Sequence, residues 1–168
     1  MDYPPERNPY YIREYARFLF ENDRDIDLAF ELTQEYKSLL GAEADHWTPY
    51  LIAHSYAYQN QLNKGVQIFD EWMEEYVFSK NKEDELWPYR FYIDFALFYN
   101  VNLDKALEYA YILEDMLPSP YYKKQLAKLL YLHNKKNQAI IKLREIIPLI
   151  EDANEKEEID NLIERYKT

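Results

Sequence analysis

The feature that most constrains this chain is a recurring pair of small residues, each pair set in two amphipathic segments joined by a short polar turn. The pairs are Ala16 with Ala29, Ala53 with Gly65, Ala96 with Ala106, and Ala127 with Ala139. Within the pairs the separations are 13, 12, 10 and 12 residues, and from one first residue to the next they are 37, 43 and 31. Such periods are typical of two-helix repeats. Small residues at a crossing let two helices pack closely, and around Ala53 and Gly65 we expect Tyr56, Phe69 and Trp72 to fill the space.

The composition favours the same all-α fold. Only two glycines, Gly41 and Gly65, occur in 168 residues, whereas tight hairpins and phosphate-binding loops depend on glycine. The scarcity excludes the P-loop, the dinucleotide fingerprint and the nucleophile elbow. A hydrophobic content of 48% excludes simple disorder and is enough for one domain with a real core.

The charges and the missing cysteines remove further classes of function. The chain has 20 Lys and Arg against 31 Asp and Glu, a net charge of -11 that opposes binding to nucleic acid or to anionic membranes. Without cysteine there is no disulfide, thiolate metal site or cysteine nucleophile. No run of 18 apolar residues and no signal-peptide pattern occurs, so membrane insertion is not expected. A cytoplasmic location is favoured, and a periplasmic one stays open if an export signal was removed.

Start and stop signals divide the chain into four helix pairs, at about 8–41, 45–78, 86–118 and 119–151. Asn8-Pro9 and Ser119-Pro120 are N-caps followed by proline at the first helical position. Gly41 is a predicted C-cap, Asp45 is a predicted N-cap, and Pro148 is expected to end or kink the eighth helix. The predicted helices cover about 9–21, 27–40, 46–60, 64–78, 88–100, 103–117, 120–133 and 136–147. The polar segment SKNKEDE after Phe78 is interpreted as a solvated loop, with a hinge or partner-docking segment as the alternative.

The segment 152–168 is predicted to be a C-terminal capping helix. Asp152 with Glu155, or Asn154 with Glu157, has the spacing of a capping box. One face carries apolar residues at helical spacing, namely Ile159, Leu162, Ile163 and Tyr166. The opposite face is strongly charged, as is needed to shield the last apolar surface of a helical stack.

Two of the pairs carry a further pattern. Ala53, Tyr56 and Gly65 place a small residue, a large one three later and a second small one twelve after the first, and Ala127, Leu130 and Ala139 do the same. In this pattern the chain resembles the tetratricopeptide repeat (TPR) family over residues 8–151, with looser spacing in the first and third repeats and the unit-closing proline only at Pro118. The resemblance implies a right-handed α-solenoid of about four helix-turn-helix repeats, whose first helices line a concave groove.

The resemblance also implies which side chains line the groove, namely those six and three before, and one and four after, the first small residue of each repeat. They are Tyr10, Arg13, Arg17 and Phe20; Trp47, Tyr50, His54 and Ala57; Arg90, Ile93, Leu97 and Asn100; and Tyr121, Lys124, Lys128 and Tyr131. Five of these sixteen are Arg or Lys and none is acidic, whereas an even distribution would give roughly two basic and three acidic residues. Because the groove has the opposite sign to the chain, we expect an acidic or carboxylate-bearing peptide as ligand.

The predicted binding residues have two roles. Arg13, Arg17, Lys124 and Lys128 would attract acidic groups, and Trp47 with Tyr50 would supply apolar anchors. Tyr10, His54, Arg90, Tyr121 and Tyr131 complete the predicted site. Some family members hold a terminal carboxylate with paired basic and asparagine residues, but here no asparagine follows either basic pair and Ile93 and Leu97 interrupt the middle. The alternative is that the basic residues only balance surrounding carboxylates.

Catalytic and metal chemistry has little support in the sequence. His46 and His54 are eight apart, and Tyr50 occupies the position where an i, i+4 metal pair needs a ligand, so no metal or cofactor is expected. Asp94 lies four after Arg90 and is predicted to form a salt bridge with it. We therefore expect a non-catalytic adaptor that binds another protein or peptide. The alternatives are a glycan- or small-ligand-binding module that stacks ligands on its tyrosines, and a self-assembling structural protein that uses the apolar end of the stack or the tail.

Overall fold

The computed structural model describes residues 8–40, 47–79 and 86–168 of the chain. In those residues every regular element is a helix and none is a strand, which confirms the predicted all-α fold. The expected caps at Gly41 and Asp45, and residues 80–85 of the polar segment, lie outside the described residues. The chain divides into two compact units, Met1–Glu85 and Leu86–Thr168.

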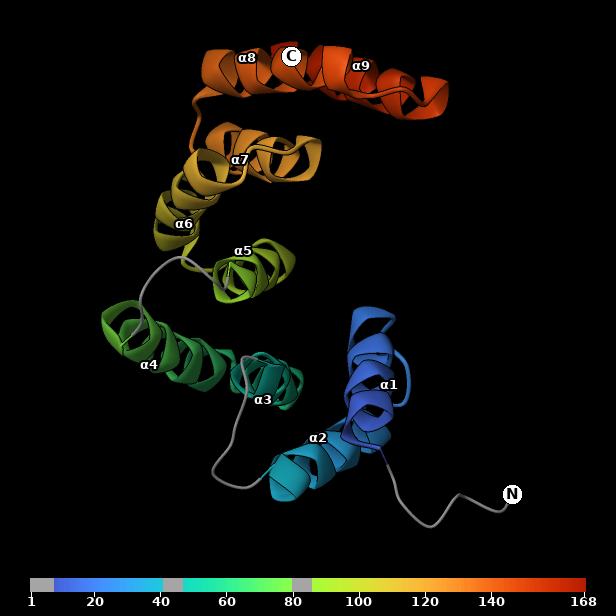
Figure 1. The fold of residues 1–168 in the computed structure, drawn as a ribbon, viewed down its shortest axis with the longest axis vertical. Helices are drawn as coiled ribbons and strands as arrows, with labels where there is room; N and C mark the ends of the chain where they lie inside the picture. The colour runs from blue at the N-terminus through green and yellow to red at the C-terminus, as the bar shows by residue number, and fades with distance from the viewer. Residues whose placement is uncertain (1–7, 41–46, 80–85) are drawn as a thin grey trace. The chain divides into compact units, whose positions relative to one another are not determined.

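The first unit contains two helix pairs (Figure 1). They are α1 (Pro9–Glu21) with α2 (Ile26–Leu40), and α3 (Trp47–Tyr58) with α4 (Leu62–Ser79). The two helices of each pair pack against each other, α2 also packs against α3, and α1 contacts α3. The large side chains that are fully buried here include Phe20, Leu51, Phe69 and Met73. The helices follow the predicted spans to within a few residues.

The second unit continues the same pattern with five α-helices in its described residues (Figure 1). They are α5 (Trp87–Tyr99), α6 (Leu103–Met116), α7 (Pro120–Leu132), α8 (Lys136–Ile146) and α9 (Ala153–Lys167). Each packs against the next, and the buried core includes Leu113, Leu126, Leu143 and Ile159. Pro148 lies in a short 3-10 helix, η1 (Ile147–Leu149), so α8 ends close to this proline as predicted.

The turn inside each of the four helix pairs is closed by the same hydrogen bond. A backbone N–H donates to the carbonyl five residues earlier, at 2.8 to 3.0 Å, from Arg24 to Leu19, Gln61 to Tyr56, Val101 to Ala96, and Lys135 to Leu130. The residue before each donor is left-handed, with φ of 51° at Asp23, 59° at Asn60, 56° at Asn100 and 58° at Asn134. This is the Schellman geometry, and Asn and Asp tolerate it better than other residues with a side chain. The chain thus builds these turns without glycine.

The helix starts agree with the predicted caps. The Asn8 side chain accepts a hydrogen bond from the Tyr10 N–H at 2.9 Å, and the Ser119 hydroxyl accepts one from the Tyr122 N–H at 3.3 Å. At the start of α9 the Asp152 carboxylate accepts from the Glu155 N–H at 2.8 Å. These bonds satisfy backbone donors that have no partner inside the helix.

The crossing of α3 and α4 depends on Gly65. A Cβ atom at this position would lie 2.6 Å from the carbonyl oxygen of Ala53, closer than any side chain tolerates. Ala53 and Phe69 are both fully buried, and the Phe69 ring lies 5.9 Å from the Trp72 ring. The predicted close packing of the two small residues is confirmed.

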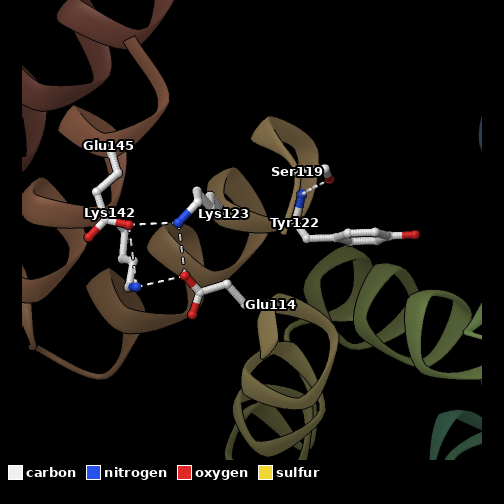
Figure 2. A network of polar contacts seen from close by, with 6 residues as sticks. All are labelled: Glu114, Ser119, Tyr122, Lys123, Lys142 and Glu145. Carbon is white, nitrogen blue, oxygen red and sulfur yellow. Dashed lines mark hydrogen bonds and ion pairs between the residues drawn. The ribbon is translucent and has the colours of Figure 1, made fainter. Parts of the chain in front are cut away.

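Charged side chains from α6, α7 and α8 form a closed ring in the second unit (Figure 2). Lys123 Nζ lies 3.0 Å from Glu114 Oε1 and 2.7 Å from Glu145 Oε2, and Lys142 Nζ lies 2.7 Å and 3.5 Å from the same two atoms. Burial alone would raise the pKa of Glu114, but hydrogen bonds from Lys142 and Lys123 lower it. The pKa of Glu145 is also lowered, chiefly by its hydrogen bond from Lys123. In this ring every charge has opposite charges beside it.

Candidate functional site

Polar and charged side chains from three helices meet on one surface of the second unit, which we call the α5–α7–α9 face. Hydrogen bonds, ring contacts and charge interactions link its members to one another. They are Arg90 and Asp94 of α5, Tyr121, Lys124, Gln125 and Lys128 of α7, and Arg165 of α9. The first helix of each pair in this unit, together with α9, contributes to the face.

Asp94 joins α5 to α7. The Tyr121 hydroxyl donates to its two carboxylate oxygens at 3.1 and 3.3 Å, and Gln125 Nε2 donates to Oδ1 at 3.0 Å. Arg90 Nε lies 3.6 Å from Oδ2, which confirms the predicted salt bridge. Burial raises the pKa of Asp94, while the Tyr121 hydrogen bond and the Arg90 charge oppose that rise. The carboxylate is therefore an integral part of the face and is already held by its neighbours.

Arg90 is packed between two aromatic rings. Its guanidinium carbon lies 4.7 Å from the centre of the Tyr121 ring and 5.3 Å from that of Trp87. Burial by itself disfavours the charged form, but Tyr121 and Asp94 raise the pKa of Arg90. The cation is stabilised by both rings and by Asp94, and its orientation is fixed.

The adjoining part of the face is rich in positive charge. Lys124 Nζ lies 3.6 Å from Glu158 Oε2 of α9. Lys128 has no hydrogen bond or ion pair with the described residues, and its pKa is lowered, first by burial and then by the nearby charges of Lys124 and Arg165. Asp94 offsets this effect only in part. Lys128 therefore carries a half-buried cation whose charge is poorly compensated, and a carboxylate or another anion could compensate it.

Two stacked tyrosines lie beside these cations and join α7 to α9. The rings of Tyr131 and Tyr166 are 3.9 Å apart and nearly parallel, at 6°. Lys136 Nζ lies 5.9 Å from the centre of the Tyr131 ring, and the Arg165 guanidinium lies 5.9 Å from that of Tyr166. Tyr131 is thus engaged in holding α9 against α7.

The predicted basic pair of the first unit is neutralised by its neighbours. Arg13 and Arg17 each place a guanidinium nitrogen 2.9 Å from a carboxylate oxygen of Glu14, and Arg17 Nε also lies 3.8 Å from Glu21. Tyr10 is 54% exposed and has the Arg13 guanidinium 4.8 Å from its ring centre. On α1 the alternative interpretation, in which basic residues balance carboxylates, describes the geometry better.

Two other predicted groove residues lie in the core of the first unit. Tyr50 is 5% exposed and His54 2% exposed, with their rings 4.4 Å apart and the His54 ring 5.8 Å from that of Phe20. Burial lowers the pKa of His54 to about 3, so the imidazole is neutral. Neither side chain is available to a ligand, because α3 is buried on almost every side. The side chain of Trp47 lies outside the described part of the chain.

The third helix pair has a different register from the predicted one. Asp23, Asn60 and Asn134 each follow the first small residue of their pair by seven, whereas Asn100 follows Ala96 by four. Counting back seven from Asn100 gives Ile93, which is 2% exposed and lies 13 residues before Ala106, as Ala16 lies 13 before Ala29. The predicted groove positions Ile93 and Asn100 are therefore a buried core residue and a turn residue.

When the groove positions are counted from Ile93 instead of Ala96, Asp94 becomes one of them. Arg90 and Leu97 remain groove positions in this count. Asp94 could have been identified from Asn100. A turn asparagine marks where the first helix of a pair ends, and counting back from it gives the register of that helix. Gln125 and Arg165 were also missed. Gln125 is four after Tyr121 on the same helix face, while the position of Arg165 depends on how α9 docks on α7.

Other chemistry and the comparisons add no further site. Among the described residues no group of three or more acidic or histidine side chains is placed to hold a metal ion. None of the described helices is long and apolar enough to cross a bilayer. Comparison with protein-family models, with curated proteins and with solved structures finds no match for this chain.

Proposed function

We propose that this chain is a non-catalytic scaffold of the TPR type, and that its α5–α7–α9 face binds an acidic segment of another protein. In this proposal the four helix pairs are divergent repeats of a right-handed solenoid, and α9 is the capping helix. The recurring pair turns, and the packing of each helix on its neighbour within each unit, support the repeat interpretation. The first unit contributes framework rather than charge, because Glu14 and Glu21 together balance Arg13 and Arg17.

The observation that carries the proposal is that the half-buried cation of Lys128 lies near the charges of Lys124 and Arg165 in a chain of net charge -11, while Glu158 pairs with Lys124 rather than with Lys128. Holding like charges together costs free energy unless a counter-charge is present. Lys123, the residue before Lys124, shows the contrast, because two glutamates compensate it in the ring of Figure 2. The missing counter-charge for Lys128 is assigned to a carboxylate of the ligand.

The neighbouring aromatic side chains suit a peptide ligand. Tyr121 is 40% exposed and Trp87 47% exposed, and both present flat apolar surface beside Arg90. Aromatic and arginine side chains contribute most of the binding free energy in many protein interfaces. An extended or helical segment with acidic residues next to an apolar one would match this arrangement of cations and rings.

The proposal is tested with a pull-down from native extract at low and high salt. The double variant Lys124→Ala with Lys128→Ala is compared with Lys37→Ala with Lys135→Ala, which removes the same charge from exposed positions elsewhere. We expect the partner to be lost with the first variant and at high salt, and kept with the second. For the purified partner the first variant should weaken binding at least about tenfold, or about 1.4 kcal/mol.

Two results would contradict the proposal. Equal loss in both variants would show that only the net charge matters. Binding of a neutral oligosaccharide with no dependence on salt would favour the glycan-binding alternative, because screening acts on charged contacts.

A further inference from the structure

The side chains of the α5–α7–α9 face follow one another in a fixed order along α7. Near the start of α7 the Arg90 guanidinium lies 4.7 Å from the centre of the Tyr121 ring. One turn later, Gln125 Nε2 donates to Asp94 Oδ1 at 3.0 Å. Lys128 follows three residues after Gln125. We call the part of the face around Tyr121 its aromatic end and the part around Lys128 its cationic end, and Asp94 lies between them.

Helix α9 brings a second cation to the cationic end. The rings of Tyr131 and Tyr166 stack at 3.9 Å, which places Arg165, the residue before Tyr166, beside the last turn of α7. The Arg165 guanidinium lies 5.9 Å from the centre of the Tyr166 ring and has no ion pair with the described residues. Its charge contributes to the lowered pKa of Lys128, so the two cations are close neighbours.

The other charges of the face balance each other within the protein. Arg90 Nε lies 3.6 Å from Asp94 Oδ2, and Lys124 Nζ lies 3.6 Å from Glu158 Oε2. Arg90 and Asp94 are the only charged residues in the sequence of α5. Only the cationic end therefore keeps positive charge that the described residues do not compensate.

The carboxylate of Asp94 is fixed where a bound chain would pass from one end of the face to the other. It accepts hydrogen bonds from Tyr121 and Gln125, and its side chain is 29% exposed. A ligand carboxylate placed here would meet a like charge, which disfavours binding. Arg90 would not attract it, because this cation is already paired with Asp94.

We propose that Asp94 is a specificity-determining residue of the α5–α7–α9 face, which excludes acidic ligand residues from the middle of the face and confines them to the cationic end. This inference rests on the proposed function, the binding of an acidic segment. The ligand then places an apolar residue against the rings of Trp87 and Tyr121 and its acidic residue beside Lys128 and Arg165.

The distance between the two ends determines the spacing of these two ligand residues. Tyr121 and Lys128 are seven residues apart on α7, which is a rise of about 10 Å at roughly 1.5 Å per residue. An extended ligand in the polyproline II conformation advances about 9 Å in three residues and returns to the same side. A helical ligand covers the same distance in about seven residues, also on one side. The recognised segment therefore has an apolar and an acidic residue three apart when extended or seven apart when helical, with no acidic residue between them.

A peptide array tests this spacing with the unmodified chain. Each peptide contains one Leu and one Glu, in either order, at every separation from one to eight residues, and a matched peptide has Gln in place of Glu. One series has a Gly-Ser background, which is flexible, and a second has an Ala background, which favours a helix. We expect Glu-dependent binding to peak at a separation of three in the first series or seven in the second. Equal binding at every separation in both series overturns the proposal.

The role of Asp94 is tested with the best peptide of the array, after a second Glu or a Gln is placed midway between its Leu and its Glu. Fluorescence anisotropy should show that the midway Glu weakens binding to the unmodified chain at least about fivefold relative to Gln. In Asp94→Asn, which keeps an oxygen that can accept from Tyr121, this penalty should disappear. In Asp115→Asn, which removes a carboxylate from an exposed position on α6, it should remain.

No penalty in the unmodified chain, or the same penalty in Asp94→Asn with an unchanged circular dichroism spectrum, overturns the role of Asp94. The double variant Lys124→Ala with Lys128→Ala separates this failure from failure of the proposed function. If Glu-dependent binding is present and is lost in the double variant, the acidic-segment proposal holds and only the role of Asp94 is wrong. If Glu and Gln peptides bind the unmodified chain alike or not at all, both proposals are wrong.

Discussion

At the scale of single residues, one glycine sets the distance between two helices. Gly65 brings α4 onto the backbone of Ala53, and an added Cβ would meet the Ala53 carbonyl oxygen at 2.6 Å. The obstacle is backbone rather than a flexible side chain, so α3 and α4 would have to separate. Tyr50, His54 and Phe69 pack at the same crossing and would lose contacts as the helices moved.

Gly65→Ala should therefore destabilise the chain. In an unconstrained helix this change adds about 1 kcal/mol of stability, but here the clash should reverse the sign and cost about 1 to 3 kcal/mol. Urea denaturation followed by circular dichroism measures the change, with the exposed Asn63→Ala on the same helix as a control that should lie within about 0.5 kcal/mol of the unmodified chain. A Gly65→Ala chain as stable as the original would show that the helices can separate without cost.

At the scale of helices and turns, local sequence signals predict most of the helices and turns of the described residues. Cap residues, prolines and the spacing of small residues give the helix pairs, because these signals act within one or two turns of the chain. The register of the third pair differs from the predicted one because the prediction was counted from the small residue Ala96, whereas the turn at Asn100 puts Ile93 in the equivalent position; both residues are buried.

The site could be predicted only in part, because it depends on contacts between helices. Lys124, Lys128, Tyr121 and Arg90 were found by their position on each helix. The burial of His54 depends on Phe20 of α1, and the neutralisation of Arg13 and Arg17 depends on how Glu14 is oriented between them. Helical spacing alone contains neither kind of information.

The turns make a prediction of their own. At Asn134, where φ is 58°, Asn134→Ala should cost about 1 kcal/mol because a Cβ without a polar group disfavours the left-handed region. Asn134→Gly should be neutral or slightly stabilising at the same position. Thermal or urea denaturation distinguishes the two, and Asn137→Ala, at an exposed position on α8, controls for the loss of an amide. Equal stability of the alanine and glycine variants would contradict the role given to the left-handed turn.

At the scale of the whole molecule, the two units should respond differently to acid. Folding lowers the pKa of His54, in the first unit, from 6.5 to about 3. As the pH drops below 6.5, His54 is therefore protonated in the unfolded chain but not in the folded one, and the free energy of unfolding falls. The loss should reach about 2 kcal/mol between pH 6.5 and 5. In the second unit Glu114 and Glu145 have lowered pKa values, so their contribution is present above their ordinary pKa of 4.5 and is lost only below it.

The test is hydrogen exchange followed by mass spectrometry. The chain is equilibrated at decreasing pH and is then labelled with a short pulse at one fixed pH. We expect α1 to α4 to lose protection at a higher pH than α5 to α9. His54→Phe removes the titrating group and keeps an aromatic ring against Phe20 and Tyr50, so in this variant the early loss should disappear. Simultaneous loss in both units, or an unchanged order in the variant, would assign the acid sensitivity to other groups.

Within each unit, the packing of each helix on its neighbour in sequence also determines how the chain reaches its native state. Contacts between neighbouring helices close short loops, so most of the native contacts form without a long search for distant partners. Helical proteins dominated by such contacts fold within microseconds to milliseconds. Any helix pair can serve as the starting point, and a newly made chain can begin to fold at its first pair before the last helix exists.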